Sequence, residues 1–109
     1  MKKVLFICSQ NKFRSPTAER IFSNLPDFEV SSAGINNDAA NPLSSEDLEE
    51  ADYIFVMEKI QRNKIQKKFK EHLKNKKIVC LDIPDEYEYM DPALVKLLKS
   101  KLDKFFEGK

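Results

Sequence analysis

The stretch that decides the fold lies near the N-terminus, where residues 4–16 read VLFICSQNKFRSP. Its first four residues are apolar without alternation, as in a β-strand that is buried on both faces of a sheet. A polar loop from Cys8 to Arg14 follows. Ser15-Pro16 then indicates the start of a helix, because serine is a good N-cap and proline suits the first helical position. A strand that passes through a short loop into a helix is the usual beginning of an α/β sheet.

The rest of the chain continues this alternation of strands and helices. After a first helix over residues 15–25, further strands are expected at 28–32, 53–57 and 78–81. Further helices are expected from Ser44, over the basic segment 60–73 and from Asp91-Pro92, with a loop at 35–43. Alternating strands and helices imply right-handed crossovers and a parallel sheet with helices on both faces. We therefore expect a single α/β domain over residues 1–109.

Composition excludes several classes of protein. The chain has 109 residues, of which 41% are hydrophobic, enough for one modest core. No apolar run is long enough to cross a bilayer, and the apolar stretch after Lys3 is too short for a secretory signal, so a cytoplasmic protein without membrane contact is expected. The two cysteines have no metal-site or disulfide spacing, and His72 is the only histidine and is expected to be solvated. No metal site is therefore expected.

The charges are segregated, although the formal net charge is only +1. Residues 59–77 contain nine lysines and arginines but a single acid, Glu71, whereas acids dominate the segments before and after. The simplest interpretation is the solvated face of a helix. The alternative is a docking surface for an acidic partner. A nucleic acid is a less favoured partner for this surface, because the lysines are not interleaved with aromatic residues and belong to no nucleic-acid motif.

Cys8 and Arg14 stand six positions apart at the two ends of the first loop. A loop that feeds a helix can bind a phosphate-sized dianion through convergent backbone N–H groups and the positive end of the helix dipole. The same field favours the thiolate form of a cysteine at the bottom of the loop. Anion binding and nucleophile activation would then share one loop, which indicates a phosphatase. The alternative for Cys8 is a small buried hydrophobe at a strand end.

Four stretches of the chain match one family pattern in the right order. They are Cys8-x-x-Asn11-x-x-Arg14-Ser15-Pro16-x-Ala18-Glu19, Val30-Ser31-Ser32-Ala33-Gly34, Asp52-x-Ile54-x-x-Met57-Glu58 and Ile83-Pro84-Asp85-x-Tyr87. They resemble the phosphate loop, the second strand, the third strand and the acid loop of low-molecular-weight protein tyrosine phosphatases. The resemblance implies a flavodoxin-like domain whose four-stranded parallel sheet has the order 2-1-3-4.

The resemblance also implies the chemistry of a phosphate-monoester hydrolase that needs no metal or organic cofactor. Cys8 would attack phosphorus and form a phosphocysteine, while Arg14 would hold two phosphate oxygens with its planar fork. Asp85 would protonate the leaving phenolate and later activate water. The substrate would be a phosphorylated protein or a small aryl phosphate. The loop residues whose backbone would complete the anion cradle are Ser9, Gln10, Asn11, Lys12 and Phe13.

Further residues are implied to support this loop. Asn11 would hold its tight conformation, because asparagine tolerates left-handed backbone angles. Ser15 would donate a hydrogen bond to the thiolate, and Ser32 would support Asn11. Tyr87 and Tyr89 would flank the pocket and stack on the substrate ring.

Several alternatives stay open on the sequence alone. From the residues by themselves Asp85 is equally a plain turn residue, Asp82 competes with it for the role of the acid, and Asp91 has a competing role as a helix cap. A phosphate-binding module without turnover is a second possible function. An arsenate reductase is a third, but such enzymes need further cysteines, and only Cys80 is available, in a strand where a buried and inert thiol is expected.

The chain departs from the family pattern at three places. Gln10 replaces a glycine, which would cost about 1 kcal/mol if that position needed a positive φ. Phe13 replaces a second cysteine, so that Cys8 would lack a nearby thiol to protect it from irreversible oxidation. The segment 35–51 is short and lacks one wall of the family's substrate pocket. The site should therefore be shallow, or completed by another molecule.

Overall fold

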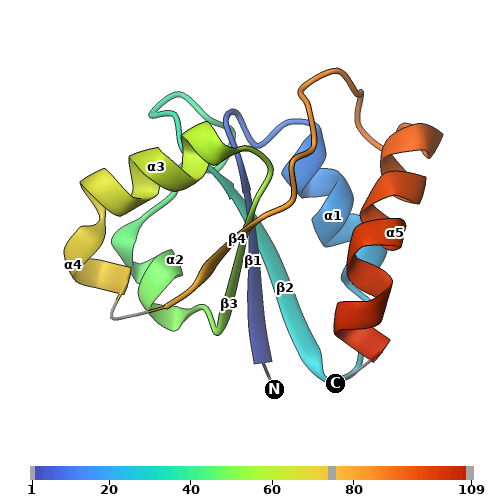
Figure 1. Cartoon of the computed structure of the whole chain (residues 1–109), viewed down its shortest axis with the longest axis horizontal. Coiled ribbons are helices and arrows are strands. Elements are labelled where there is room, and N and C mark those ends of the chain that lie inside the picture. The colour runs from blue at the N-terminus through green and yellow to red at the C-terminus, as the bar shows by residue number, and fades with distance from the viewer. Residues whose placement is uncertain (1, 74–75, 108–109) are drawn as a thin grey trace.

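The computed structural model, in which we describe residues 2–73 and 76–107, is built on one parallel sheet (Figure 1). Within the described residues its four strands lie in the order β2-β1-β3-β4. Their bounds are Lys2–Cys8 for β1, Phe28–Gly34 for β2, Tyr53–Val56 for β3 and Ile78–Cys80 for β4. All three pairings are parallel. The expected sheet order and direction are confirmed.

Helices cover both faces of this sheet, as Figure 1 shows. On one side lie α1 (Arg14–Phe22) and α5 (Pro92–Glu107). On the other lie α2 (Ser45–Glu50), α3 (Lys59–Lys68) and the short α4 (Lys70–Leu73). None of the described helices is both long and apolar enough to span a membrane.

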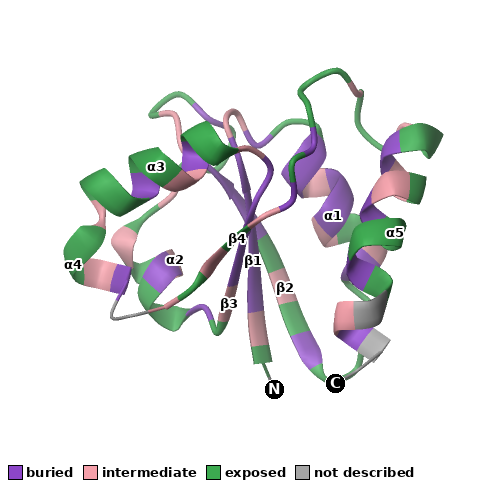
Figure 2. Cartoon of the chain, in the orientation of Figure 1, coloured by how far each residue is buried: buried purple, intermediate pink, exposed green. Residues whose placement is uncertain are grey.

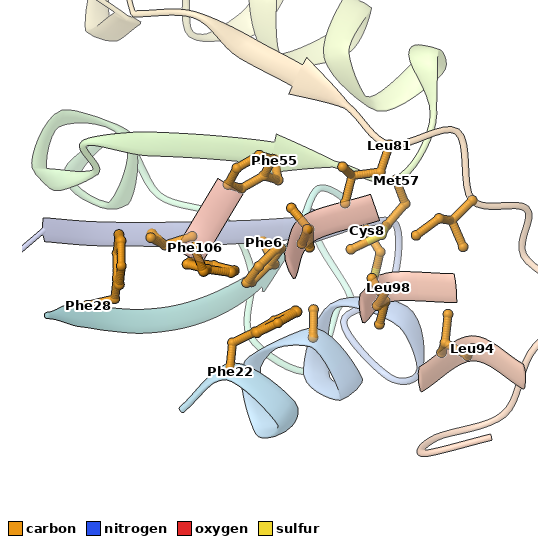
Figure 3. Close-up of a cluster of buried hydrophobic side chains, with 14 residues drawn as sticks. Phe6, Cys8, Phe22, Phe28, Phe55, Met57, Leu81, Leu94, Leu98 and Phe106 are labelled. Carbon is orange, nitrogen blue, oxygen red and sulfur yellow. The ribbon is translucent and has the colours of Figure 1, made fainter. Parts of the chain in front are cut away.

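Strand β1 is buried on both faces, which explains its continuous apolar run (Figure 2). Val4, Phe6 and Cys8 belong to the core under α1 and α5, together with stacked and tilted aromatic rings. Leu5 and Ile7 belong to the second core, under α2, α3 and α4. Cys8 closes the first core at the carboxyl end of the strand (Figure 3). The core therefore fixes the position of this thiol.

Two helix starts were expected from capping signals and are confirmed. Ser44 and Asp47 form the reciprocal capping box at the start of α2. At the start of α5, Asp91 Oδ1 accepts a hydrogen bond from the N–H of Ala93 at 2.9 Å.

Two expectations about helices are wrong. Helix α1 begins at Arg14, and Ser15 does not cap it, because the Ser15 hydroxyl lies 3.0 Å from Cys8 Sγ instead. The basic segment is not one continuous helix. Phe69 interrupts it between α3 and α4 with backbone angles outside the helical region, and its ring packs against the second core. In each case a tertiary contact of the side chain outweighs the local helix signal.

Candidate active site

The loop that follows β1 curls around the sulfur of Cys8. Cys8 is only 3% exposed, and its Sγ accepts a hydrogen bond from the backbone N–H of Asn11 at 3.2 Å. Asn11 has a φ of 57°, one of three positive values among the described non-glycine residues, and asparagine adopts this left-handed conformation more easily than most residues. Gln10 is not among the three, so the strain that would follow from a positive φ there does not arise. The loop closes without the glycine that Gln10 replaces.

A chain of hydrogen bonds leads from this sulfur to a carboxylate on α1. Asn11 Nδ2 donates to Ser15 Oγ at 2.9 Å and to Ser32 Oγ at 3.0 Å, which uses both amide hydrogens. Ser32 Oγ in turn donates to Glu19 Oε1. Ser15 Oγ, which accepts from Asn11, keeps its own hydrogen for Cys8 Sγ at 3.0 Å, since the alternative acceptor Ala33 O is 3.5 Å away. The network therefore points a hydroxyl donor at the sulfur.

Replacing Ser32 with alanine should lower kcat/KM for an aryl phosphate by about tenfold to a hundredfold, because the buried Asn11 amide then loses one of its acceptors. Steady-state kinetics on the purified variant measure the loss. The matched control is Ser31→Ala, whose side chain is exposed on the same strand. Equal kinetics for the two variants would contradict a role for the network.

Arg14 is the second fixed point of the loop, and only 2% of its side chain is exposed. Its Nη1 donates to Glu58 Oε1 at 2.7 Å and to the carbonyl oxygen of Ile83 at 2.8 Å. Those two bonds use both hydrogens of Nη1. The edge formed by Nε and Nη2 remains, and its two parallel N–H groups match two oxygens of a phosphate. Asp85 Oδ1 lies 3.7 Å from Nε, beyond hydrogen-bond distance.

Gln61, on the first turn of α3, ties the end of β3 to the loop. Its fully buried side chain accepts from the N–H groups of Met57 and Glu58, both at 2.9 Å, and donates from Nε2 to Ser9 Oγ at 3.1 Å. The signal for this contact was the capping-box spacing of Glu58 and Gln61, which the sequence interpretation did not use. Glu19 and Glu58 stand in the stretches that match the family pattern, but the sequence did not indicate their bonds to Ser32 and Arg14.

The small cavity above the sulfur gathers residues from two loops. It has a volume of about 40 Å³ and is lined by Cys8, Gln10, Lys12, Phe13, Arg14 and Asp85. Asp82 does not line it. Its Oδ1 accepts instead from Cys80 Sγ at 3.3 Å, and the residue borders a separate hollow beside Lys59 and Pro84.

The two tyrosines expected at the pocket lie elsewhere. Tyr87 is half-buried and packs against the first core, and Tyr89 is 50% exposed. Neither lines the cavity above Cys8. Phe13, which is 42% exposed, is the aromatic side chain that does. An aromatic wall is therefore present, but it comes from the phosphate loop itself.

The second thiol, Cys80, is half-buried rather than fully buried, which corrects the expectation for it. Burial raises the pKa of the Cys80 thiol above its ordinary value, so it stays protonated at neutral pH. Cys80 lies on β4, which is separated from β1 by β3. Two strand spacings place its Cα about 10 Å from β1, beyond the roughly 7 Å that a disulfide allows. Cys8 and Cys80 are therefore not placed to form a disulfide.

His72 is not simply solvated, contrary to expectation. Its Nδ1 lies 2.6 Å from Glu49 Oε2 on α2, and 38% of its side chain is exposed. The pair joins α4 to α2, at the end of the second helical layer away from the phosphate loop (Figure 1).

The chain is similar in sequence and in fold to known phosphatases. Residues 3–42 match the family described as low molecular weight phosphotyrosine protein phosphatase. A low-molecular-weight protein tyrosine phosphatase from T. tengcongensis superposes on the whole chain with a TM-score of 0.80 and 25% identity, and 100% of each chain is covered. The N-terminal part of the chain thus matches this family, and the whole chain has the fold of that phosphatase. The loop around Cys8 lies within the residues that match.

Two further solved structures share the fold at lower identity. The tyrosine phosphatase Wzb from Escherichia coli K30, in complex with phosphate, has 22% identity and a TM-score of 0.82, with 98% of this chain and 97% of that one covered. The YwlE arginine phosphatase from Geobacillus stearothermophilus has 22% identity and a TM-score of 0.80, with 99% and 92% covered. No curated protein matches the chain in sequence.

Proposed function

We propose that this phosphatase hydrolyses phosphotyrosine in proteins, or small aryl phosphates, through a phosphocysteine on Cys8. One observation carries the proposal. The sulfur is held by the N–H of Asn11 and the hydroxyl of Ser15, in the same cavity as Arg14 and Asp85. A nucleophile, an anion-binding fork and a carboxyl group thus meet around a space that a phosphate can enter.

In the first step the Cys8 thiolate attacks phosphorus in line with the ester oxygen. The S–P bond forms while the P–O bond breaks, and the leaving oxygen takes a proton from the Asp85 carboxyl group. The Nε–Nη2 edge of Arg14 and the backbone N–H groups of the loop stabilise the charge on the three remaining oxygens. Asp85 is 63% exposed, which leaves it open to a leaving group that points to solvent.

In the second step water attacks the phosphocysteine. Asp85, now ionised, takes a proton from the water as the new P–O bond forms, and the S–P bond breaks. The electron pair returns to sulfur, where the Ser15 hydroxyl stabilises the thiolate through its hydrogen bond. Inorganic phosphate leaves, and the carboxyl group is protonated again.

The direct test is hydrolysis of p-nitrophenyl phosphate and of a phosphotyrosine peptide by freshly reduced protein. Steady turnover of both supports the proposal. Tight phosphate binding without turnover, in protein with its full thiol content, would instead identify a phosphate-binding module.

Arsenate reduction is not favoured, because Cys80 is the only other cysteine and is not placed to form a disulfide with Cys8. A catalytic thiol needs a reducing compartment, which is our reason to propose the cytoplasm.

Replacing Asp85 with asparagine should lower kcat by roughly a hundredfold for phenyl phosphate, because the poor leaving group then departs without a proton. The loss should shrink for p-nitrophenyl phosphate, whose leaving group hardly needs one. Measuring kcat for both esters gives the comparison. Asp82→Asn is the matched control, since Asp82 bonds to Cys80 and does not line the cavity. If Asp82→Asn shows this dependence on the leaving group and Asp85→Asn does not, Asp85 is not the acid.

A further inference from the structure

A basic groove runs beside the phosphate loop, between the segment after β2 and helix α3. It has a volume of about 610 Å³ and is lined by Ile35, Asn36, Asn37, Lys64, Lys67 and Lys68. Both of its walls contact Ser9 of the phosphate loop. The N–H of Asn36 donates to Ser9 O at 3.1 Å, and Gln61, one turn before Lys64 on α3, donates to Ser9 Oγ at 3.1 Å. Ser9 thus fixes the position of the groove relative to the phosphate loop.

The lysines of this groove have no acidic partner within the described part of the chain. Lys64, Lys67 and Lys68 are exposed and form none of the ion pairs found among residues 2–73 and 76–107. Asp38, in the opposite wall segment, is exposed and is paired with none of them either. In Figure 2 most of the α3 ribbon has the colour of exposed residues. Three positive charges therefore face one hollow without neutralisation.

Lys76, a basic side chain of the same segment 59–77, is by contrast used inside the protein. Lys76 Nζ donates to the carbonyl oxygens of Leu48 and Glu49 at the end of α2. Among the described residues Lys64 and Lys67 have no such contact, and Lys68 Nζ lies 5.5 Å from the centroid of the Phe69 ring, which leaves its charge without an acidic partner.

We propose that this groove binds acidic side chains that flank the phosphorylated residue of a protein substrate, an inference that rests on the proposed phosphatase activity. Charge complementarity selects the occupant, because an acidic segment pairs with the three lysines while its phosphate enters the neighbouring loop. At 1.5 Å per residue, Lys64 and Lys68 lie about 4.5 and 10.5 Å along α3 from Gln61. An extended peptide advances about 3.3 Å per residue and covers these distances in about one to three residues. About one or two further residues lead from the phosphate loop to Gln61, so the acids should lie about two to five positions from the phosphotyrosine.

The test uses two phosphotyrosine peptides that differ only in having glutamate or glutamine at those flanking positions. For the wild-type enzyme, kcat/KM should be about fivefold to tenfold higher for the glutamate peptide at low ionic strength, through KM, and the preference should fade with added salt. The variant Lys64→Gln/Lys67→Gln/Lys68→Gln should lose the preference while hydrolysing p-nitrophenyl phosphate as well as the wild type does. The matched control, Arg20→Gln/Lys99→Gln/Lys101→Gln, removes the same charge from the helices on the other face of the sheet and should keep the preference.

Each failure has its own signature. Equal kcat/KM for the two peptides in the wild-type enzyme, with normal turnover of p-nitrophenyl phosphate, would overturn the groove proposal alone. Absence of turnover for every ester would overturn the proposed function. In that case anisotropy of the two labelled peptides still tests the groove, and equal affinities would refute it. A labelled single-stranded oligonucleotide that binds more tightly than the glutamate peptide, and depends on the same lysines, would assign the groove to nucleic acid instead.

Discussion

Replacing Cys8 with serine is expected to lower kcat for every phosphate ester by at least about ten-thousandfold. A serine hydroxyl is a weak nucleophile unless a base removes its proton, and the chain's only histidine, His72, is paired with Glu49 on α2. The fold should survive, because a hydroxyl fits the space of the thiol and still accepts from the Asn11 N–H. Kinetics with p-nitrophenyl phosphate measure the loss, and titration with inorganic phosphate should show that binding remains.

The control for this variant is Cys80→Ser, which removes the other thiol of the chain. It should keep the full rate, because Cys80 does not line the cavity above Cys8. Turnover by Cys8→Ser at a rate comparable to that of Cys80→Ser would show that the reaction does not pass through the sulfur of Cys8. Such a result would exclude the phosphocysteine.

Replacing Arg14 with lysine is expected to lower kcat/KM by about a thousandfold, although the positive charge is kept. The guanidinium performs two tasks at once, since Nη1 is bonded to Glu58 and to the carbonyl of Ile83 while the other edge is left for the anion. A single ammonium group cannot reach both sets of acceptors. Steady-state kinetics together with phosphate affinity should show a loss in both quantities.

Arg20→Lys is the matched control, because Arg20 lies on the same helix with its side chain exposed. It should leave both quantities unchanged. If Arg14→Lys retains most of its activity, a point charge is sufficient at this place and the two-oxygen grip is wrong. The melting temperature of Arg14→Lys should fall as well, because two buried or half-buried acceptors then lose their donor.

The fold could be predicted mainly from local patterns, namely apolar runs and helix-capping signals. The unbroken apolar run of β1 indicated a central strand, and its neighbours β2 and β3 do cover it on both edges. The capping signals of α2 and α5 were sufficient because they act within three residues. The positive φ of Asn11 agrees with the tight conformation expected of that residue. These features depend on neighbours in sequence or on a resemblance, and both can be read from a chain.

The sequence interpretation failed where a side chain finds its partner far along the chain. The local pattern of Ser15 indicated a helix cap, and only the family resemblance implied its bond to the sulfur seven residues before it. Glu58, which was given no role, meets Arg14 across 44 positions. The ring of Tyr87 packs against the first core, and no pattern in the neighbouring sequence predicts this contact. Periodicity and capping rules describe what a segment prefers by itself. They do not say which of two possible partners a polar or aromatic side chain will meet.

The contacts of Arg14 also bear on how the protein acquires its activity. This one side chain joins the loop after β1 to the end of β3 and, over 69 positions, to the segment after β4. Contacts of such long range form late, because the entropy of closing the intervening chain opposes them until the sheet is assembled. A partly folded chain, or one cut before β4, thus has a cysteine and an arginine but no pocket between them. Catalysis should switch on only when the last strand has joined the sheet.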